Sequence, residues 1–512
     1  MKRFKLVTVI SVLCLALVLS SCSGLGLTKK SDGGEGEITY WMSLSATDKV
    51  EIRNMAETPL GKALKERTGI SVEYIHPDSD EQFNLMLASG DLPDIIQTNW
   101  ITEYPGGPDK AIAEKQIIPI DDLMEKYAPN LTKYLKEHPE IDKMVTTQSG
   151  EHYMFPFVRG DEYLLISYGP VVRKDWLDDI GMDVPETMED WYNMLKAFKN
   201  QKSSEAPLTT YLPLVNGVFS SAYGAPQAFF IDNGKVKYGP MLDGYKDCLK
   251  ELNRWYNEGL LNNNFMGLDQ KMMDSAILTG TAGATTGSVG SGIGKWMAAA
   301  TEEGYELVAA PYPVLNKGEK AMYSARQNPA PGFGAAISAD CKNPELAMKF
   351  LDYFYSEEGS MLLNFGIEGE SYEMIDGYPT YTDIITKNPE GKSMAAMLGQ
   401  YARSATQAPF VQDRRYMEQF AALPQQKEAV DIWSDTDAAN HVMPPINPSA
   451  EDSSELAKIL SEVTTYVDEY TVKFVAGQIS FSEWETYISQ LESLKIDRAI
   501  EIYQDAYDAY SK

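Results

Sequence analysis

The sequence predicts an α/β protein of two or more lobes, and two observations support this fold class. The 476 residues of 37–512 exceed what one hydrophobic core usually serves. Between residues 38 and 96, short apolar strands alternate with helices of about ten residues, which is typical of a mainly parallel sheet with helices on both faces. In such sheets, ligands bind beyond the carboxyl ends of the strands.

The amino-terminal elements are expected in the order β-α-β-α-β. Each strand is a short apolar or alternating run, and each helix has apolar residues at helical spacing. Gly69 ends the first helix, since glycine is common just after a helix. The expected elements are strand 38–41, helix 59–67, strand 70–75, helix 81–88 and strand 95–96.

A second α/β region is expected beyond residue 157. It begins with a strand over 164–168 and continues with a helix that opens at Thr187, whose side chain forms a capping pair with the carboxylate three residues later. A further helix starts at 343–344 and ends at Gly359. The chain finishes in two helices, one on either side of Gly477.

Residues 1–21 have the features of an export signal. A basic start precedes an apolar run over 6–19, which is shorter than the roughly 20 residues of a spanning helix. The box Leu19-Ser20-Ser21-Cys22 resembles that of bacterial lipoproteins, which implies that Cys22 is diacylated and becomes the first mature residue. An ordinary signal peptide with a coincidental cysteine is the alternative. Residues 22–36 then form the acylated Cys and a flexible tether rich in Gly, Ser and charge.

The charge of the chain argues against nucleic acid as a partner. The net charge is −29, and loss of the three basic residues of the signal peptide makes the mature chain −32. Such a surface repels phosphate backbones. Besides Cys22, the mature chain keeps two cysteines. These two, Cys248 and Cys341, form either one disulfide or two free thiols.

Enzyme signatures are mostly absent. The four histidines form no HExxH motif, no G-x-S-x-G occurs, and no Cys and His cluster has metal-ligand spacing. The Gly-rich run 279–295 fails as a phosphate loop, because Val289 stands where a Gly is needed and Trp296 where a Ser or Thr is needed. We interpret it as a strand over 281–286 that opens into a Gly/Ser loop at a site rim or a helix entrance. A pair of catalytic carboxylates stays an open alternative, and no cofactor is expected.

Five stretches across the mature chain together carry a family pattern. They are 61–74 (GKALKERTGISVEY), 83–96 (FNLMLASGDLPDII), 168–199 (YGPVVRKDWLDDIGMDVPETMEDWYNMLKAFK), 365–373 (FGIEGESYE) and 466–491 (YVDEYTVKFVAGQISFSEWETYISQL). In this order and spacing, the chain resembles extracellular solute-binding proteins of family 1. The resemblance is to the long lipoprotein branch that serves carbohydrate ABC transporters in Gram-positive bacteria.

The resemblance implies a two-lobed, type II periplasmic-binding-protein-like fold with a ligand cleft between the lobes and a helical C-terminal segment. Several crossings of the chain would act as a hinge, two of them at 153–157 and 330–334. Lobe 1 would comprise 37–156 and 333–369, and lobe 2 would comprise 157–332 and 370–512 with the C-terminal helices.

Metal binding is the point at which the sequence departs from some relatives. Those relatives follow the helix that ends near residue 199 with a calcium loop rich in Asp, Asn and Gly. Here 200–207 (NQKSSEAP) has one carboxylate and no Gly. A calcium site needs about six or more oxygen ligands, so no metal site is expected in this stretch.

A sugar offers apolar C–H faces and rings of hydroxyls, so its site needs aromatic platforms and planar polar groups. Trp41 and Trp100 are the first candidates, since each follows a predicted strand at its carboxyl end, and Asn99 beside Trp100 could bond a hydroxyl. Arg173 could do the same, with an internal ion pair to Asp175 or another acid as the alternative. Further candidates precede the second crossing or have Gly-rich or polar flanks: Arg326, Gln327, Asn328, Trp296 and Trp433.

The sequence is therefore interpreted as a lipid-anchored receptor on the extracellular face of the cell membrane. By the resemblance, it captures an oligosaccharide and delivers it to the permease subunits of an ABC importer, with closure of the lobes as the signal. We expect a monomer without enzymatic activity. A surface enzyme acting on polysaccharide and a sensor or adhesin of the same fold are the two rival interpretations.

Overall fold

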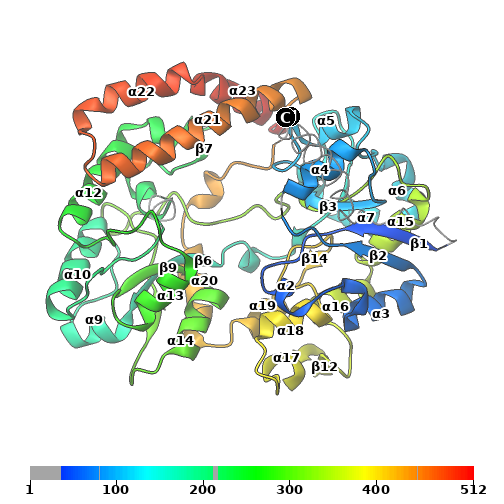
Figure 1. Ribbon diagram of the computed structural model, residues 1–512, viewed down its shortest axis with the longest axis horizontal. Helices are drawn as coiled ribbons and strands as arrows, with labels where there is room; N and C mark the ends of the chain where they lie inside the picture. Colours follow the sequence, from blue (N-terminus) through cyan, green and yellow to red (C-terminus); the bar gives the residue numbers. More distant parts are fainter. Residues whose placement is uncertain (1–35, 80, 212–216, 447) are drawn as a thin grey trace, which may run out of the picture.

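The computed structural model describes residues 36–79, 81–211, 217–446 and 448–512. The predicted signal peptide, Cys22 and all of the tether except Gly36 lie outside the described residues. Two lobes lie side by side, with a layer of helices across one end of both (Figure 1). Within the described ranges, no helix is long and apolar enough to cross a membrane.

The first lobe is built on a five-stranded sheet in the order β2-β1-β3-β11-β4. Strands β1 (Glu37–Trp41), β2 (Ser71–Ile75) and β3 (Ile95–Asn99) are parallel, as the sequence predicts. Strand β4 (Phe155–Pro156) leads out of this lobe and β11 (Phe333–Ile337) returns from the other, and β11 runs antiparallel to both β3 and β4. The sheet is therefore mixed at the edge that adjoins the second lobe.

The first helix that the sequence predicts has the predicted ends. Helix α3 (Pro59–Thr68) begins after Thr58, whose side chain accepts a hydrogen bond from the Gly61 N–H, and ends at Gly69 with a φ of 71°. The other helices packed in this lobe are α2 (Asp48–Glu51), α4 (Glu81–Ser89), α5 (Gly107–Ala113), α6 (Asp121–Tyr127), α7 (Pro129–Glu137), α8 (Pro139–Val145), α15 (Pro344–Tyr353) and α16 (Glu357–Phe365).

The predicted end of helix α15 at Gly359 is wrong. The helix ends at Tyr353, and Gly359 lies in the first turn of α16. A Cβ at this position would lie 1.8 Å from the Tyr353 carbonyl oxygen. The glycine therefore permits a close approach of two helix ends, whereas the sequence suggested a helix stop.

The second lobe contains an antiparallel sheet in the order β10-β6-β9, formed by β10 (Leu307–Ala309), β6 (Tyr168–Arg173) and β9 (Ala284–Ser288). The predicted strand over 164–168 is misplaced, since β6 begins only at Tyr168. Residues 162–164 form a 3-10 turn instead. Residues 289–294 after β9 form a π-helical segment that runs into α14 (Lys295–Ala299). The Gly-rich run is thus a helix entrance.

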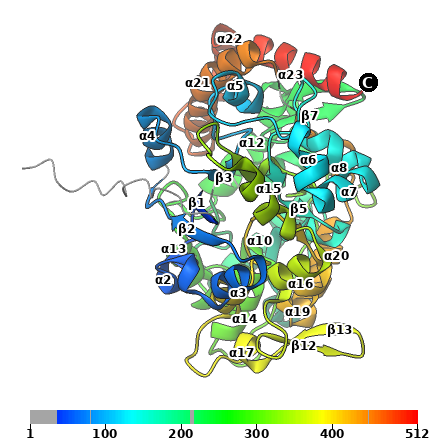
Figure 2. The same cartoon turned by 90° about the vertical axis from the view of Figure 1, so that its right-hand side faces the viewer.

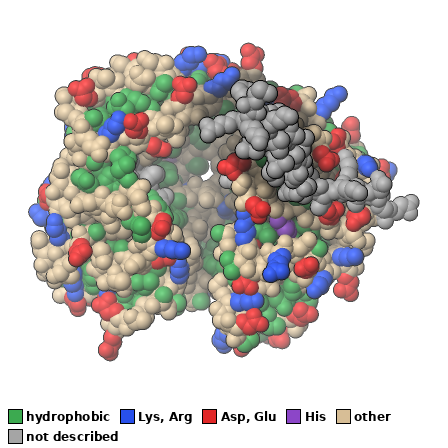
Figure 3. Space-filling model, viewed as in Figure 1, with side chains coloured by type: hydrophobic (Ala, Val, Ile, Leu, Met, Phe, Trp, Pro, Cys, Tyr) green, Lys and Arg blue, Asp and Glu red, His purple; other side chains and the backbone are tan. Residues whose placement is uncertain are grey.

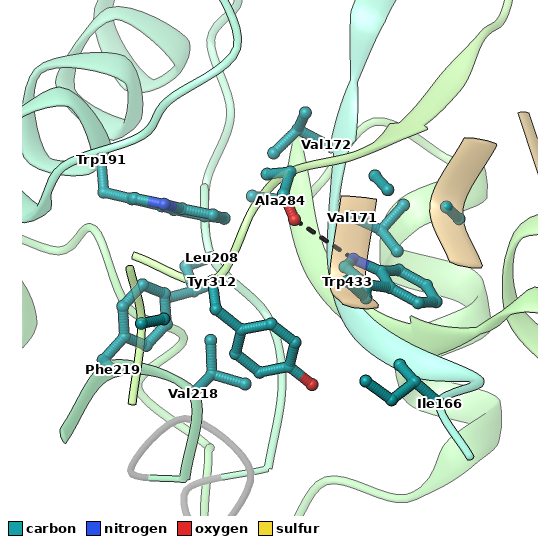
Figure 4. Close-up of a cluster of buried hydrophobic side chains, with 14 of the residues drawn as sticks. Ile166, Val171, Val172, Trp191, Leu208, Val218, Phe219, Ala284, Tyr312 and Trp433 are labelled. Carbon is teal, nitrogen blue, oxygen red and sulfur yellow. Dashed lines mark hydrogen bonds between the residues drawn. The ribbon is translucent and has the colours of Figure 1, made fainter. Parts of the chain in front are cut away.

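Aromatic packing dominates the core of the second lobe. Helix α10 (Met188–Gln201) opens with the predicted capping box of Thr187 and Asp190. Its Trp191 packs edge to face with Phe219, which packs in the same way against Trp255 on α12 (Asp243–Asn257). Figure 4 shows Trp191 and Phe219 in this core, with Trp433 packed nearby. Other elements of the second lobe are α9 (Lys174–Ile180), β7 (Phe229–Asp232), β8 (Lys235–Tyr238), α13 (Gln270–Leu278) and α20 (Pro424–Ser434). Residues 372–420 contain β12 (Tyr372–Ile375), β13 (Tyr378–Tyr381), α17 (Asp383–Thr386), α18 (Met394–Tyr401) and α19 (Arg414–Phe420). These elements lie below the first lobe in Figure 1, and α18 packs against α2 and α3.

The C-terminal helices span both lobes. Helix α21 (Ala450–Val475) packs against α5 of the first lobe and α12 of the second, and Gly477 ends this helical stretch with a φ of 67°. Helices α22 (Trp484–Ser493) and α23 (Ile496–Tyr510) complete the layer, which Figures 1 and 2 show above both lobes. The predicted C-terminal helices are confirmed.

Three segments that connect the lobes lie side by side. Strand β5 (Val158–Arg159) pairs in parallel with β14 (Val411–Gln412), and the Arg159 N–H donates to the Pro329 carbonyl oxygen at 2.9 Å. Two of these connections adjoin the stretches predicted as crossings, while the one near residue 411 was not predicted. Cys248 and Cys341 are free thiols, in agreement with one of the two alternatives.

Candidate ligand-binding site

A pocket of about 350 Å³ opens at the edge of the first-lobe sheet where β1 and β3 end. Phe333 and Gln407 in its wall adjoin the segments that connect the lobes, so the pocket lies beside these connections. Figure 3 shows a hollow between the two lobes. Three aromatic side chains, one proline and a set of polar side chains line it: Trp41, Phe83, Phe333, Pro77, Ser43, Ser79, Thr98, Asn99, Thr102, Glu103 and Gln407.

The topology of the sheet brings these residues together. Trp41 and Asn99 are the last residues of parallel strands, whose carboxyl ends meet at one edge. Strand β11 runs in the opposite direction, so its first residue, Phe333, pairs with Asn99. Phe83 comes from α4, which follows β2. A βαβ arrangement of this kind gathers side chains at the carboxyl edge, where ligands bind.

Asn99 shapes the wall of the pocket through its own hydrogen bonds. Its Oδ1 accepts from the Ile101 and Thr102 backbone N–H groups at 3.1 and 3.2 Å, and its Nδ2 donates to the Pro331 carbonyl oxygen at 3.2 Å. The amide group carries two hydrogens. One of them is thus left for a ligand, while the rest of the group ties β3 to a connecting segment.

Trp100 does not line the pocket. Its side chain is fully buried, and its ring packs against those of Phe83 and Tyr104 at centroid distances of 6.2 and 6.1 Å. Strand β3 ends one residue earlier, and the Trp100 N–H donates to the Gly332 carbonyl oxygen. The structure therefore places Trp100 behind Phe83, while Trp41 and Asn99 reach the pocket.

Comparison with known proteins bears on the nature of this two-lobed arrangement. The model of the family described as bacterial extracellular solute-binding protein matches residues 54–361, more than half of the chain. The chain belongs to this family. The predicted family is confirmed, and both the family and the relatives described next are binding proteins.

Two relatives and one solved structure illustrate the similarity. The fructooligosaccharide ABC transporter substrate-binding protein FusA of Streptococcus pneumoniae is 24% identical over 99% of both chains. Lipoprotein LipO of Bacillus subtilis is 25% identical over 78% of this chain and 80% of its own. The alginate-binding protein AlgQ2, solved without calcium ion, has a TM-score of 0.75 and 24% identity, covering 92% of this chain and 98% of its own. The predicted two-lobed fold is confirmed.

Three of the candidate residues lie inside the second lobe of this solute-binding protein, with no exposed side-chain surface. Arg173 forms ion pairs with Asp175 and Glu302, so the alternative of an internal ion pair is confirmed. The indole N–H groups of the other two donate to protein oxygens: Trp296 to Asp274 at 2.7 Å and Trp433 to Ala310 at 3.1 Å.

Glycines that face these two tryptophans have a packing role. A Cβ at Gly287 would lie 2.6 Å from the Trp296 ring, and one at Gly169 would lie 2.5 Å from the Trp433 ring. Because any side chain there would displace an indole, the glycines make room for buried rings. For Trp296, the Gly-rich run that suggested exposure is thus explained by close packing, whereas Gly169 is far from Trp433 in sequence.

The residues before the second crossing connect segments of the hinge region. Arg326 forms an ion pair with Glu162, and the Asn328 Nδ2 donates to the Met443 carbonyl oxygen at 2.9 Å. The Gln327 side chain is exposed, and its backbone N–H donates to the Leu165 carbonyl oxygen. None of the three lines the described pocket.

Sequence reasoning identified only Trp41 and Asn99 among the residues that line the pocket, and it missed Phe83, Glu103, Phe333 and Gln407 among others. Phe83 belongs to an amphipathic helix and is read as core, and only the tertiary fold brings Gln407 to this edge. Phe333 stood within a predicted crossing, which was the one available signal. Within the ranges described, no three His, Cys, Asp or Glu side chains form a group that could hold a metal ion.

Proposed function

We propose that this chain is an extracellular, lipid-anchored substrate-binding protein that captures an oligosaccharide and delivers it to an ABC importer. The observation that supports this most is the pocket at the carboxyl edge of the first-lobe sheet. Its three rings match the C–H faces of sugars, and its polar wall matches their hydroxyls. The name of FusA, a fructooligosaccharide-binding relative, points to the same ligand class.

Closure of the lobes would turn binding into a signal. The pocket occupies one lobe and adjoins three connecting segments that lie side by side. A ligand seated there meets the second lobe only when the lobes approach, so it binds the closed form better and shifts the population toward it. The permease subunits would then recognise the two lobe surfaces in their closed arrangement.

The location and anchoring follow from the amino terminus. The Leu19 to Cys22 box and the segment behind it would hold the folded part, as a monomer, on the outer face of the membrane through two acyl chains. The name of the relative LipO, a lipoprotein, supports this assignment.

A thermal-shift screen of the mature chain against an oligosaccharide panel tests the proposal. A ligand at a hundred times its dissociation constant should stabilise the folded state by about 2.7 kcal/mol. Product analysis of each stabilising sugar after prolonged incubation should recover it intact. Hydrolysis of that sugar would favour the polysaccharide-acting enzyme, and the absence of any shift across the panel would contradict sugar capture.

A further inference from the structure

Arg159 occupies the point where the connecting segments meet. It ends strand β5, pairs with Gln412 of β14, and donates its backbone N–H to the Pro329 carbonyl oxygen. The backbone at this residue is thus fixed on two sides.

The sheet register relates Arg159 to the pocket. The Phe157 N–H donates to the Phe333 carbonyl oxygen at 2.8 Å, which continues the antiparallel pairing of β4 with β11. The Arg159 guanidinium carbon lies 5.0 Å from the centre of the Phe157 ring. The Arg159 side chain therefore packs beside the residue whose backbone bonds to Phe333 in the pocket wall.

The charge of Arg159 is not balanced by the part of the chain that the structure describes. Apart from the exposed Arg53, every other arginine there has a carboxylate oxygen within 4.0 Å: Arg67, Arg173, Arg254, Arg326, Arg403, Arg414, Arg415 and Arg498. Arg159 has none among the described residues, and its Nη1 is buried without a hydrogen-bond partner there. Burial lowers the pKa of the Arg159 guanidinium to about 10. An uncompensated charge of this kind destabilises a fold, which points to a partner that arrives from outside.

We infer that Arg159 binds a carboxylate of the ligand, so that the cleft takes an acidic, uronate-containing oligosaccharide. The guanidinium presents a planar fork of N–H donors that matches a carboxylate, whereas a neutral sugar would leave the charge unbalanced. The aromatic rings of the pocket would hold the sugar faces. This inference rests on the proposed function and specifies its ligand class.

The names of the similar proteins leave this choice open. They include a fructooligosaccharide, which is neutral, and alginate, which is a polyuronate. The net charge of the chain acts against an acidic ligand at long range. Recognition must therefore be local, and a higher ionic strength should accelerate association by screening the repulsion.

Isothermal titration with matched sugars tests the inference. The probes are trisaccharides of galacturonate and mannuronate, their methyl esters of the same length and linkage, and a panel of neutral oligosaccharides. The wild-type chain should bind at least one acid about tenfold or more tightly than its ester. Arg159→Gln should abolish this preference and Arg159→Lys should keep part of it, while Arg53→Gln, which removes the same charge at an exposed position, should leave it unchanged.

Two results would overturn the inference and leave the proposed function in place. One is a neutral sugar or an ester bound as tightly as the acids, with no change in Arg159→Gln. The other is a clear fall in the ligand-free melting temperature of both Arg159→Gln and Arg159→Met, since removal of an unbalanced charge should leave that temperature unchanged or raise it. Failure of every acidic and neutral sugar to bind would contradict the proposed function itself.

Discussion

Trp100 and Phe83 pack edge to face, with ring centroids 6.2 Å apart and ring planes at 75°. Phe83 lines the pocket on one side of this contact, and Trp100 is fully buried on the other. The indole thus supports a ring that can touch ligand. Although the two rings are in contact, Trp100 therefore contributes to stability and Phe83 can contribute to binding.

Trp100→Ala should destabilise the ligand-free fold. Loss of a fully buried aromatic side chain costs about 3 to 5 kcal/mol through lost burial and the remaining cavity. Trp100→Phe should recover much of this stability, because it keeps a ring against Phe83. Denaturant unfolding of both variants measures the difference, and an unchanged midpoint in Trp100→Ala would contradict the core assignment.

Phe333→Ala should weaken sugar binding more than it weakens the fold. The ring is partly exposed at the pocket. If stacking hides about 60 Å² at about 25 cal/mol per Å², its loss costs roughly 1.5 kcal/mol, or about tenfold in affinity. Trp41 is only 7% exposed, so it offers less surface for stacking and Trp41→Ala should also lower stability.

A matched control for Phe333 is Phe229→Ala, since Phe229 is a partly buried ring of the second lobe that does not line the pocket. Calorimetric titration with the best ligand of the panel should separate the two variants. Equal affinity of both would remove Phe333 from the binding surface.

Glu103→Gln should change affinity in a direction that depends on the charge of the ligand. Glu103 is the one carboxylate among the described residues that line the pocket. A ligand carboxylate about 8 Å from the Glu103 carboxylate would be repelled by roughly 0.5 to 2 kcal/mol, for effective dielectric constants between about 80 and 20. The variant should therefore bind an acidic sugar severalfold more tightly and a neutral sugar no more tightly, which titration with acid and ester pairs measures.

The first lobe could be predicted from sequence because local signals and tertiary packing agree there. The start of α3 at Pro59, the stop at Gly69 and the apolar strand at 95–96 each have a local cause, and each lies as predicted within a few residues. The strand at 164–168 was misplaced because its apolar residues are buried in a turn. Burial alone does not distinguish a turn from a strand.

The site was harder to predict, because it depends on residues that are far apart in sequence. Trp41 and Asn99 could be placed from the rule that ligands bind at carboxyl ends of strands. Gln407 reaches the same wall from more than 300 residues away, and no local pattern marks it. The offset of one residue between Asn99 and Trp100 decides which of two neighbouring side chains reaches the pocket, and strand ends are predicted with a larger error than this.

Chelation should leave both stability and affinity unchanged. Residues 200–207 contain one carboxylate and no Gly, and a calcium site needs about six or more oxygen ligands. Melting curves and titrations with and without EDTA provide the measurement. A loss of stability in EDTA that calcium restores, but magnesium does not, would show a calcium site that this reasoning has overlooked.

Cys22→Ala should release the protein from the membrane or leave its signal uncut. The box at 19–22 carries the prediction, because the cysteine is the acceptor of both acyl chains and a single alanine removes it. Ser23→Ala is the matched control, since it lies one residue beyond the cysteine and keeps the box intact. Fractionation of expressing cells, with mass spectrometry of the mature amino terminus, gives the readout. Cys22→Ala that stays in the membrane fraction with a correctly processed terminus would show that another feature of the chain anchors it.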